Sequence, residues 1–164
     1  MWWSLRWPSL PAFVWAGLGA AVCVAALAWI GEQSMLPVLM APFGATLVIV
    51  FALPSSPLAQ PRNVVLGHVL TTALGLAALQ AAQWLELSPQ HPLLMAVATG
   101  LGVSLMMMLR CVHPPAGANP LLVLMTMPGW HFLFTPVAVG ALFIVLCAWV
   151  WHRAHGQAYP VSGR

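Results

Sequence analysis

Residues 113–120 read His-Pro-Pro-Ala-Gly-Ala-Asn-Pro and hold the side chains best suited to chemistry in this chain. Three prolines in eight residues exclude a regular helix, because each removes a backbone donor and restricts the residue before it. Gly117 permits a close approach between the backbone and a ligand. The apolar run 121–127 then ends at Pro128, so any helix that begins near Gly117 is short. We predict irregular backbone that leads into a half-helix.

A second segment repeats this pattern. Residues 42–46, Pro-Phe-Gly-Ala-Thr, match residues 115–119, Pro-Ala-Gly-Ala-Asn, at an offset of 73. Helices that begin near 43–45 and 116–118 would present unpaired N–H groups and the positive ends of their dipoles, which suit a small anion. Thr46 and Asn119 would each add a side-chain donor. Two such half-helices facing one another would form a compact anion site.

Two histidines could take part. His113 could donate to the anion or exchange a proton with it, since histidine titrates near neutrality, or it could simply satisfy the broken backbone. His68 lies in a long apolar run beside two threonines, and a polar residue there should face the bundle interior, where hydrogen bonding between helices is its simpler role. Arg62 follows a proline-rich stretch and could attract anions at a cytoplasmic mouth or only fix the topology.

The candidate substrate-binding residues are the two glycine segments and the polar positions associated with them: Gly44, Ala45, Thr46, Asn63, His68, His113, Pro114, Pro115, Gly117, Ala118 and Asn119. Arg62 is the candidate residue at the substrate entrance. No catalytic residues are expected, because Glu32 and Glu86 fall in predicted outer loops and no nucleophile motif occurs. A metal site needs three or four convergent ligands, and Cys111 with His113 has no second such pair. We therefore expect no enzyme activity, metal or cofactor.

The composition identifies the environment of the chain. Hydrophobic residues make up 62% of the 164 positions, charged residues 4%, and the mean hydropathy is +0.93. A soluble domain carries about 25% charged residues, because its surface must be wetted. The sequence therefore predicts an integral membrane protein in contact with a lipid bilayer. Its net charge of +3 is too dispersed to indicate a nucleic-acid surface.

Six apolar runs predict an all-α polytopic helix bundle that forms one transmembrane domain, residues 1–164. Four of the runs approach the ~20 residues that a membrane helix needs, and two are short. The runs are 11–30, 36–53, 64–85, 92–109, 117–127 and 132–151. Either all six cross the membrane, or the two short segments are re-entrant and four cross.

The charges favour six crossings. With a cytoplasmic N-terminus, all five arginines would then lie inside and both glutamates outside, as the positive-inside rule prefers. The arginines are Arg6, Arg62, Arg110, Arg153 and Arg164. We expect both termini to be cytoplasmic, in a bacterial inner membrane.

Internal repetition agrees with six elements. The offset of 73 also relates residues 63–67 to 136–140, and an offset of 83 relates 16–19 to 99–102. With three crossings per half, a repeat at about 11–86 would be inverted relative to one at about 91–153. Short segments interrupted by glycine and proline at corresponding places in inverted repeats indicate the binding site of a transporter. At membrane depth such backbone survives only where it is buried in protein or lines a polar cavity.

Three ordered motifs carry a resemblance to a known family. They are Phe-Gly-Ala-Thr at 43–46, Pro-Leu-Ala-Gln-Pro-Arg-Asn at 57–63 with Gly67-His68, and His-Pro-Pro-Ala-Gly-Ala at 113–118. The sequence from about 37 to 151 resembles the HPP family of integral membrane proteins, named for its His-Pro-Pro motif. The resemblance implies four transmembrane helices, and it implies nitrite transport because plastid and cyanobacterial members are described as nitrite transporters. Ala116 and Asn119-Pro120 depart from the Gly and Thr-Ala that are common in the family, and both departures touch the predicted anion site.

We therefore expect a membrane transporter or channel for a small monovalent anion, with nitrite as the first choice. The alternative is a non-transporting membrane scaffold or sensor subunit whose broken segments only pack the bundle. A polar, water-accessible cavity between Gly44 and Gly117 would separate the two. Because 164 residues are few for a transporter, a homodimer is the expected oligomer.

Overall fold

The computed structural model describes residues 11–35 and 38–161, and every regular element within them is helical. The α-helices are α1 (Ala12–Ser34), α2 (Ala41–Ala52), α3 (Pro61–Trp84), α4 (Pro92–Met108), α5 (Asn119–Thr126) and α6 (Val139–Ala154). Short 3-10 turns occur at η1 (Pro57–Ala59), η2 (Pro114–Ala118) and η3 (Trp130–Leu133), and η4 (Phe134–Ala138) is a π-helical turn. The predicted all-helical fold is confirmed.

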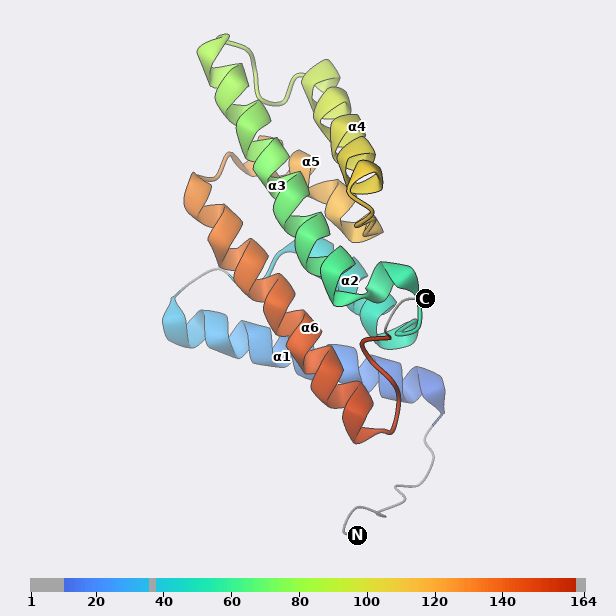
Figure 1. Ribbon diagram of the computed structural model, residues 1–164. Helices are drawn as coiled ribbons and strands as arrows, with labels where there is room; N and C mark the ends of the chain where they lie inside the picture. Colours follow the sequence, from blue (N-terminus) through green and yellow to red (C-terminus); the bar gives the residue numbers. More distant parts are fainter. Residues whose placement is uncertain (1–10, 36–37, 162–164) are drawn as a thin grey trace.

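Helices α3 and α6 run in opposite directions through the middle of the bundle (Figure 1). Helices α4 and α5 pack against α3, whereas α1 and α2 pack against α6. The turn η2 contacts both α2 and α3, so it lies where the two groups of helices meet. This arrangement brings the two predicted half-helix segments to the same region of the bundle.

Within residues 11–35 and 38–161, three helical segments are long and apolar enough to cross a membrane. They are α1, α3 and the stretch Trp130–Ala154, which joins η3, η4 and α6. Helices α4 and α2, with 17 and 12 residues, are apolar but shorter. The predicted count of four long spans is therefore not confirmed, because the run 92–109 forms the 17-residue α4. The short helix predicted after Gly117 is confirmed as α5, which has eight residues.

Prolines and left-handed residues set the limits of these helices. A proline occupies the first or second position of α2, α3, α4 and α5, where its missing N–H group has no helical partner to lose. Met35 and Met127 end α1 and α5 in the left-handed conformation. After α4, Arg110 has a φ of 51°, and the Cys111 amide donates to the Met106 carbonyl at 2.9 Å. That turn directs the chain into residues 111–118.

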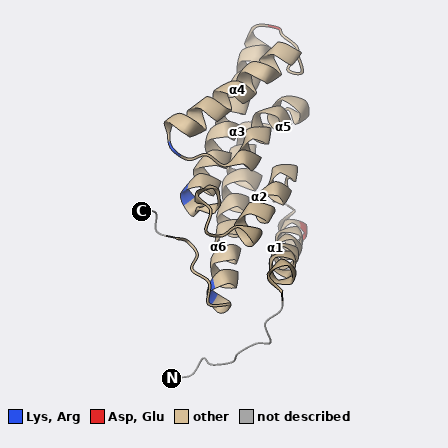
Figure 2. Cartoon of the chain, turned by 90° about the vertical axis from the view of Figure 1, so that its right-hand side faces the viewer, with Lys and Arg blue, Asp and Glu red and all other residues tan. Residues whose placement is uncertain are grey.

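Charged residues lie at the ends of the elements (Figure 2). In that view the basic positions of the described chain lie toward one flank and the acidic positions at the top and on the opposite side. Arg6 and Arg164, on which the predicted topology also rests, lie outside the described residues. The orientation of the chain in the membrane stays a prediction.

Glycines allow the closest helix contacts. A Cβ on Gly75 of α3 would lie 2.9 Å from the Cα of Pro120 and 3.1 Å from the Cβ of Val123, both on α5. Small residues let membrane helices approach in this way. By contrast, a Cβ on Gly100 of α4 would meet nothing within 4 Å.

We predict that Gly75→Ala lowers the free energy of unfolding by about 1–3 kcal/mol, because the added methyl must push the backbone of α5 away. Gly100→Ala is the matched control and should leave stability unchanged or slightly raised, since alanine favours the helix. Unfolding of both variants in detergent micelles measures the difference. Equal stability of the two variants would contradict the close α3–α5 contact.

Candidate functional site

Four polar side chains meet in the interior where α2, α3, α5 and the segment before η2 converge. They are Thr46, His68, His113 and Asn119, and none is more than 1% exposed. All four are among the residues predicted from the sequence, and they come from positions up to 73 residues apart. Polar side chains inside a membrane protein are costly unless they find partners, so their hydrogen bonds decide what this cluster can do.

His113 is held by the turn η2, which follows it, and by the turn η1. Its backbone is extended, as the following proline requires, and its carbonyl accepts from the Ala116 amide at 3.0 Å. Its Nδ1 lies 2.9 Å from the Leu58 carbonyl oxygen in η1. Since a carbonyl can only accept, Nδ1 must carry the hydrogen. In a neutral imidazole, Nε2 of His113 is then an acceptor.

The Thr46 hydroxyl bridges the two histidines. Its Oγ1 lies 2.9 Å from Nε2 of His113 and 2.8 Å from Nε2 of His68. Because the hydroxyl has one hydrogen, it donates to His113 and accepts from His68 when both rings are neutral. The ring centroids of the two histidines are 5.0 Å apart.

Asn119 completes the chain of hydrogen bonds. Its Nδ2 lies 3.0 Å from Nδ1 of His68, 3.0 Å from the His68 carbonyl and 2.9 Å from Oγ1 of Thr72. With Nε2 of His68 already a donor, its Nδ1 accepts from the Asn119 amide. The Leu58 carbonyl therefore fixes the tautomers of both rings and the direction of each hydrogen bond.

One acceptor of the cluster has no partner. Oδ1 of Asn119 is buried and forms no hydrogen bond with any described residue. Buried polar atoms in folded proteins are almost always paired, so such an atom needs an explanation. An amide oxygen can only accept, so its natural partner is an O–H or N–H group.

Not all predicted residues belong to this cluster. Gly44, Ala45 and Ala118 are exposed on the outside of the chain, and Gly117 is half-buried. A Cβ on either glycine would meet nothing within 4 Å, so both border open space. Pro115 is buried in η2, whereas Pro114 is exposed. Helix α2 begins at Ala41, two residues before the predicted start.

Arg62 and Asn63 fasten α3 to the segment that leads to His113. The Arg62 guanidinium donates from Nη1 to the Arg110 carbonyl at 2.9 Å and from Nη2 to the Leu109 carbonyl at 2.8 Å. Asn63 donates to the Val112 carbonyl at 2.8 Å. These bonds satisfy carbonyls after the end of α4 and stabilise the turn. The predicted role of Arg62 at an entrance stays a prediction.

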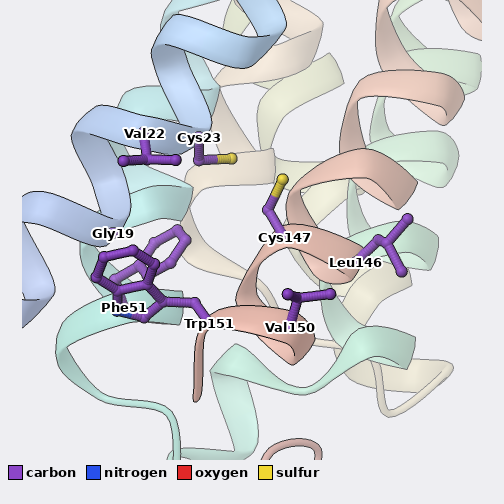
Figure 3. A pocket seen from close by; sticks show the side chains of 8 residues that line it. All are labelled: Gly19, Val22, Cys23, Phe51, Leu146, Cys147, Val150 and Trp151. Carbon is purple, nitrogen blue, oxygen red and sulfur yellow. The ribbon is translucent and has the colours of Figure 1, made fainter. Parts of the chain in front are cut away.

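A cavity of about 260 Å³ lies elsewhere, between α1, α2 and α6 (Figure 3). Its lining is largely apolar, and the thiols of Cys23 and Cys147 point toward one another in the figure. It contains none of the predicted site residues. Among residues 11–35 and 38–161, no three His, Cys, Asp or Glu side chains gather closely enough to hold a metal ion.

Sequence reasoning missed the backbone acceptors of the site. The carbonyls of Leu58 and Pro42 bond to the cluster, the latter at 3.2 Å from Oγ1 of Thr46. A proline at the second position of a helix, four residues before a threonine, could have indicated the Pro42 contact, because threonine hydroxyls bond the i−4 carbonyl. Nothing in the sequence pairs Leu58 with His113, 55 residues away.

The fold and the cluster define a polytopic helical membrane protein with a buried histidine site beside a proline-broken segment. The HPP transmembrane region model matches residues 6–160, and the chain belongs to this family. Two transmembrane proteins of Dictyostelium discoideum are similar to it. One is 33% identical over 163 residues, and the alignment covers 94% of this chain and 56% of the relative. The other is 34% identical over 128 residues, and the alignment covers 75% of this chain and 40% of the relative. The chain thus spans about half the length of these relatives, and no solved structure matches it.

We predict that Thr46→Val is destabilising, because a side chain of similar shape without the hydroxyl leaves the Nε2 atoms of both histidines unpaired. Each buried unsatisfied group costs about 1–3 kcal/mol. Thr71→Val is the matched control, since the buried Thr71 hydroxyl bonds only carbonyls of its own helix. Free energies of unfolding in micelles compare the two. A Thr46→Val variant as stable as Thr71→Val would contradict the bridging role.

Proposed function

We propose that this HPP family protein is a membrane transporter or channel for a small monovalent anion, most specifically nitrite, and that it is not an enzyme. The observation that carries the proposal is the buried cluster of Thr46, His68, His113 and Asn119. A membrane protein retains buried polar and ionisable groups at a cost, and such groups commonly mark substrate or ion pathways. The family membership agrees with a transport role.

Contacts between the two halves support an inverted repeat. Gly67 on α3 lies against the Cys111 carbonyl and the Cβ of Ala116. The offset of 73 relates Gly67 to Gly140, Val38 to Cys111 and Phe43 to Ala116. Correspondingly, Gly140 on α6 lies against the Val38 carbonyl and the Phe43 ring. Thr46 and Asn119 correspond at this offset, and both bond to His68. Paired, interrupted segments of this kind form the substrate sites of inverted-repeat transporters.

The anion preference rests on charge and backbone. The N-termini of α2 and α5 belong to the two interrupted segments, and helix N-termini favour negative charge. The elements α2, α3, α5 and η2, which surround the cluster, contain no carboxylate to repel an anion, since Glu32 lies on α1 and Glu86 follows the end of α3. Gly44 and Gly117 border open space, where a small ligand could approach the backbone. Because Gly44 is exposed and Gly117 only half-buried, a second copy in a homodimer would be needed to enclose that space.

The proposed setting is a bacterial inner membrane with both termini cytoplasmic. Its support is the segregation of basic from acidic positions and the positive-inside rule.

The test is uptake of nitrite, nitrate, formate and chloride into liposomes that carry the purified protein. We expect saturable nitrite uptake above that of protein-free liposomes. Gly117→Leu should abolish it, because the larger side chain fills the open space beside the interrupted segment. Gly100→Leu, also in open space but on α4, is the matched control and should retain uptake.

A folded preparation that moves none of these anions would overturn the transport proposal. The alternative of a non-transporting scaffold or sensor subunit would then account for the buried segments as packing. Loss of uptake in both glycine variants would point to a general effect of bulk in the membrane and would remove the assignment of Gly117 to the site.

A further inference from the structure

We infer that the Thr46–His68–His113 cluster binds one proton at Nε2 of His113 and that the anion crosses as its counter-ion, so that one proton and one monovalent anion move together. This inference rests on the proposed anion transport and names its coupling ion. It follows from the number of donors and acceptors around the Thr46 hydroxyl.

When both rings are neutral, each hydrogen bond that links Leu58, His113, Thr46 and His68 has one donor and one acceptor. Nδ1 of His113 donates to Leu58, the Thr46 hydroxyl donates to Nε2 of His113, and Nε2 of His68 donates to Thr46. The third contact of Thr46, with the Pro42 carbonyl, is the longest of the three at 3.2 Å. The hydroxyl hydrogen therefore has an unused second acceptor.

The Pro42 carbonyl, as this second acceptor, allows the cluster to bind one proton. If Nε2 of His113 gains a hydrogen, the Thr46 hydroxyl can rotate to donate to Pro42 and accept from both histidines through its two lone pairs. Every donor is again paired, and no side chain has to leave its position. The N–H bond forms at Nε2 as an O–H bond of the incoming acid or hydronium breaks, which leaves the conjugate base.

The same count excludes His68 as the place for the proton. Its Nε2 already carries a hydrogen, so a further proton would have to go to Nδ1. Nδ1 faces the Asn119 amide at 3.0 Å, and that amide nitrogen can only donate. Two donors would then oppose each other inside the bundle. His113 is the ring that can be charged.

Nothing in the surrounding elements can balance the resulting charge. Helices α2, α4 and α5 and the turns η1 and η2 contain no titratable side chain. On α3, the titratable group that faces His113 is His68. Arg62, also on α3, bonds the carbonyls of Leu109 and Arg110. Arg110 and Cys111 precede His113 in its own segment. A buried imidazolium without a carboxylate is costly. A monovalent anion supplies the missing charge.

The unpaired Oδ1 of Asn119, at the other end of the cluster, also favours a ligand that brings a proton. Oδ1 can only accept a hydrogen bond, so it repels a bare anion and favours a ligand that arrives with its proton, such as a protonated acid or a water molecule. A ligand bound there lies beside His68, whose ring links it through Thr46 to His113. Both ends of the cluster therefore favour joint binding of an anion and a proton.

The first experiment measures nitrite uptake and internal acidification together in liposomes that carry the protein and a trapped pH dye, at neutral pH and with the membrane potential clamped by potassium and valinomycin. Protein-free liposomes correct for nitrous acid that crosses the lipid. We expect one proton per nitrite and a rate that does not change with the potential. Thr46→Val and His113→Gln should reduce coupled uptake to the protein-free level, whereas Thr46→Ser, which keeps the hydroxyl, should restore it.

Nitrite uptake that follows the potential without acidification would overturn this inference and leave the proposed transport intact. Absence of uptake of every anion would overturn both. A second readout does not depend on flux: nitrogen-15 spectra of histidine-labelled protein in bilayers, with the His113 signals identified from His113→Gln. We expect His113 to become an imidazolium when nitrite is added and to remain neutral in Thr46→Val. A neutral His113 in the presence of saturating nitrite would contradict the proton site.

Discussion

The hydrogen bond from Nδ1 of His113 to the Leu58 carbonyl determines the state of the whole cluster. Because this carbonyl can only accept, it fixes the tautomer of His113, and the single hydrogen of Thr46 then fixes that of His68. The site is thus specified by a backbone atom in a three-residue turn rather than by a charged side chain. Whatever positions η1 also positions the hydrogen bonds of the histidines.

Two parts of the chain hold η1 in place. Gln60 donates to the carbonyls of Pro54 and Ser56, and its Oε1 accepts from the Val161 amide. Tyr159, which follows α6, donates to the Ala59 carbonyl at 2.9 Å, and burial raises the pKa of its phenol. The segment after α6 therefore closes over the turn that carries Leu58. The bond between Tyr159 and Ala59, which are 100 positions apart in the sequence, thus helps to hold the Leu58 carbonyl in place.

Sequence reasoning found the polar residues but not their geometry. Prolines and glycines indicated the interrupted segments at 42–46 and 113–120, because their effect on the backbone is local. The apolar composition indicated that the chain is a membrane protein. All four members of the cluster were identified. The long-range acceptor Leu58 was not, because nothing local pairs it with His113. Gly44 and Ala45 were expected beside Thr46 in the site, yet helical geometry turns neighbouring positions to different faces, and only Thr46 points inward. The run 92–109 looked like a full span by hydropathy, but the turn at Arg110 ends its helix at Met108.

The two halves of the chain have parallel contacts but unlike chemistry. At the offset of 73, Thr46 corresponds to Asn119, His113 to Met40, and His68 to Ala141. Met40 and Ala141 are buried in the apolar core between α1, α2 and α6. The place in the bundle that corresponds to the histidine pair therefore has no titratable side chain at these two positions. His68 belongs to the first repeat and His113 to the second, yet both lie at the same one of the two related places, and their counterparts Ala141 and Met40 lie at the other. In the proposed inverted repeat, this asymmetry leaves one place per chain for the proposed proton, because the apolar place offers no ring nitrogen to accept it.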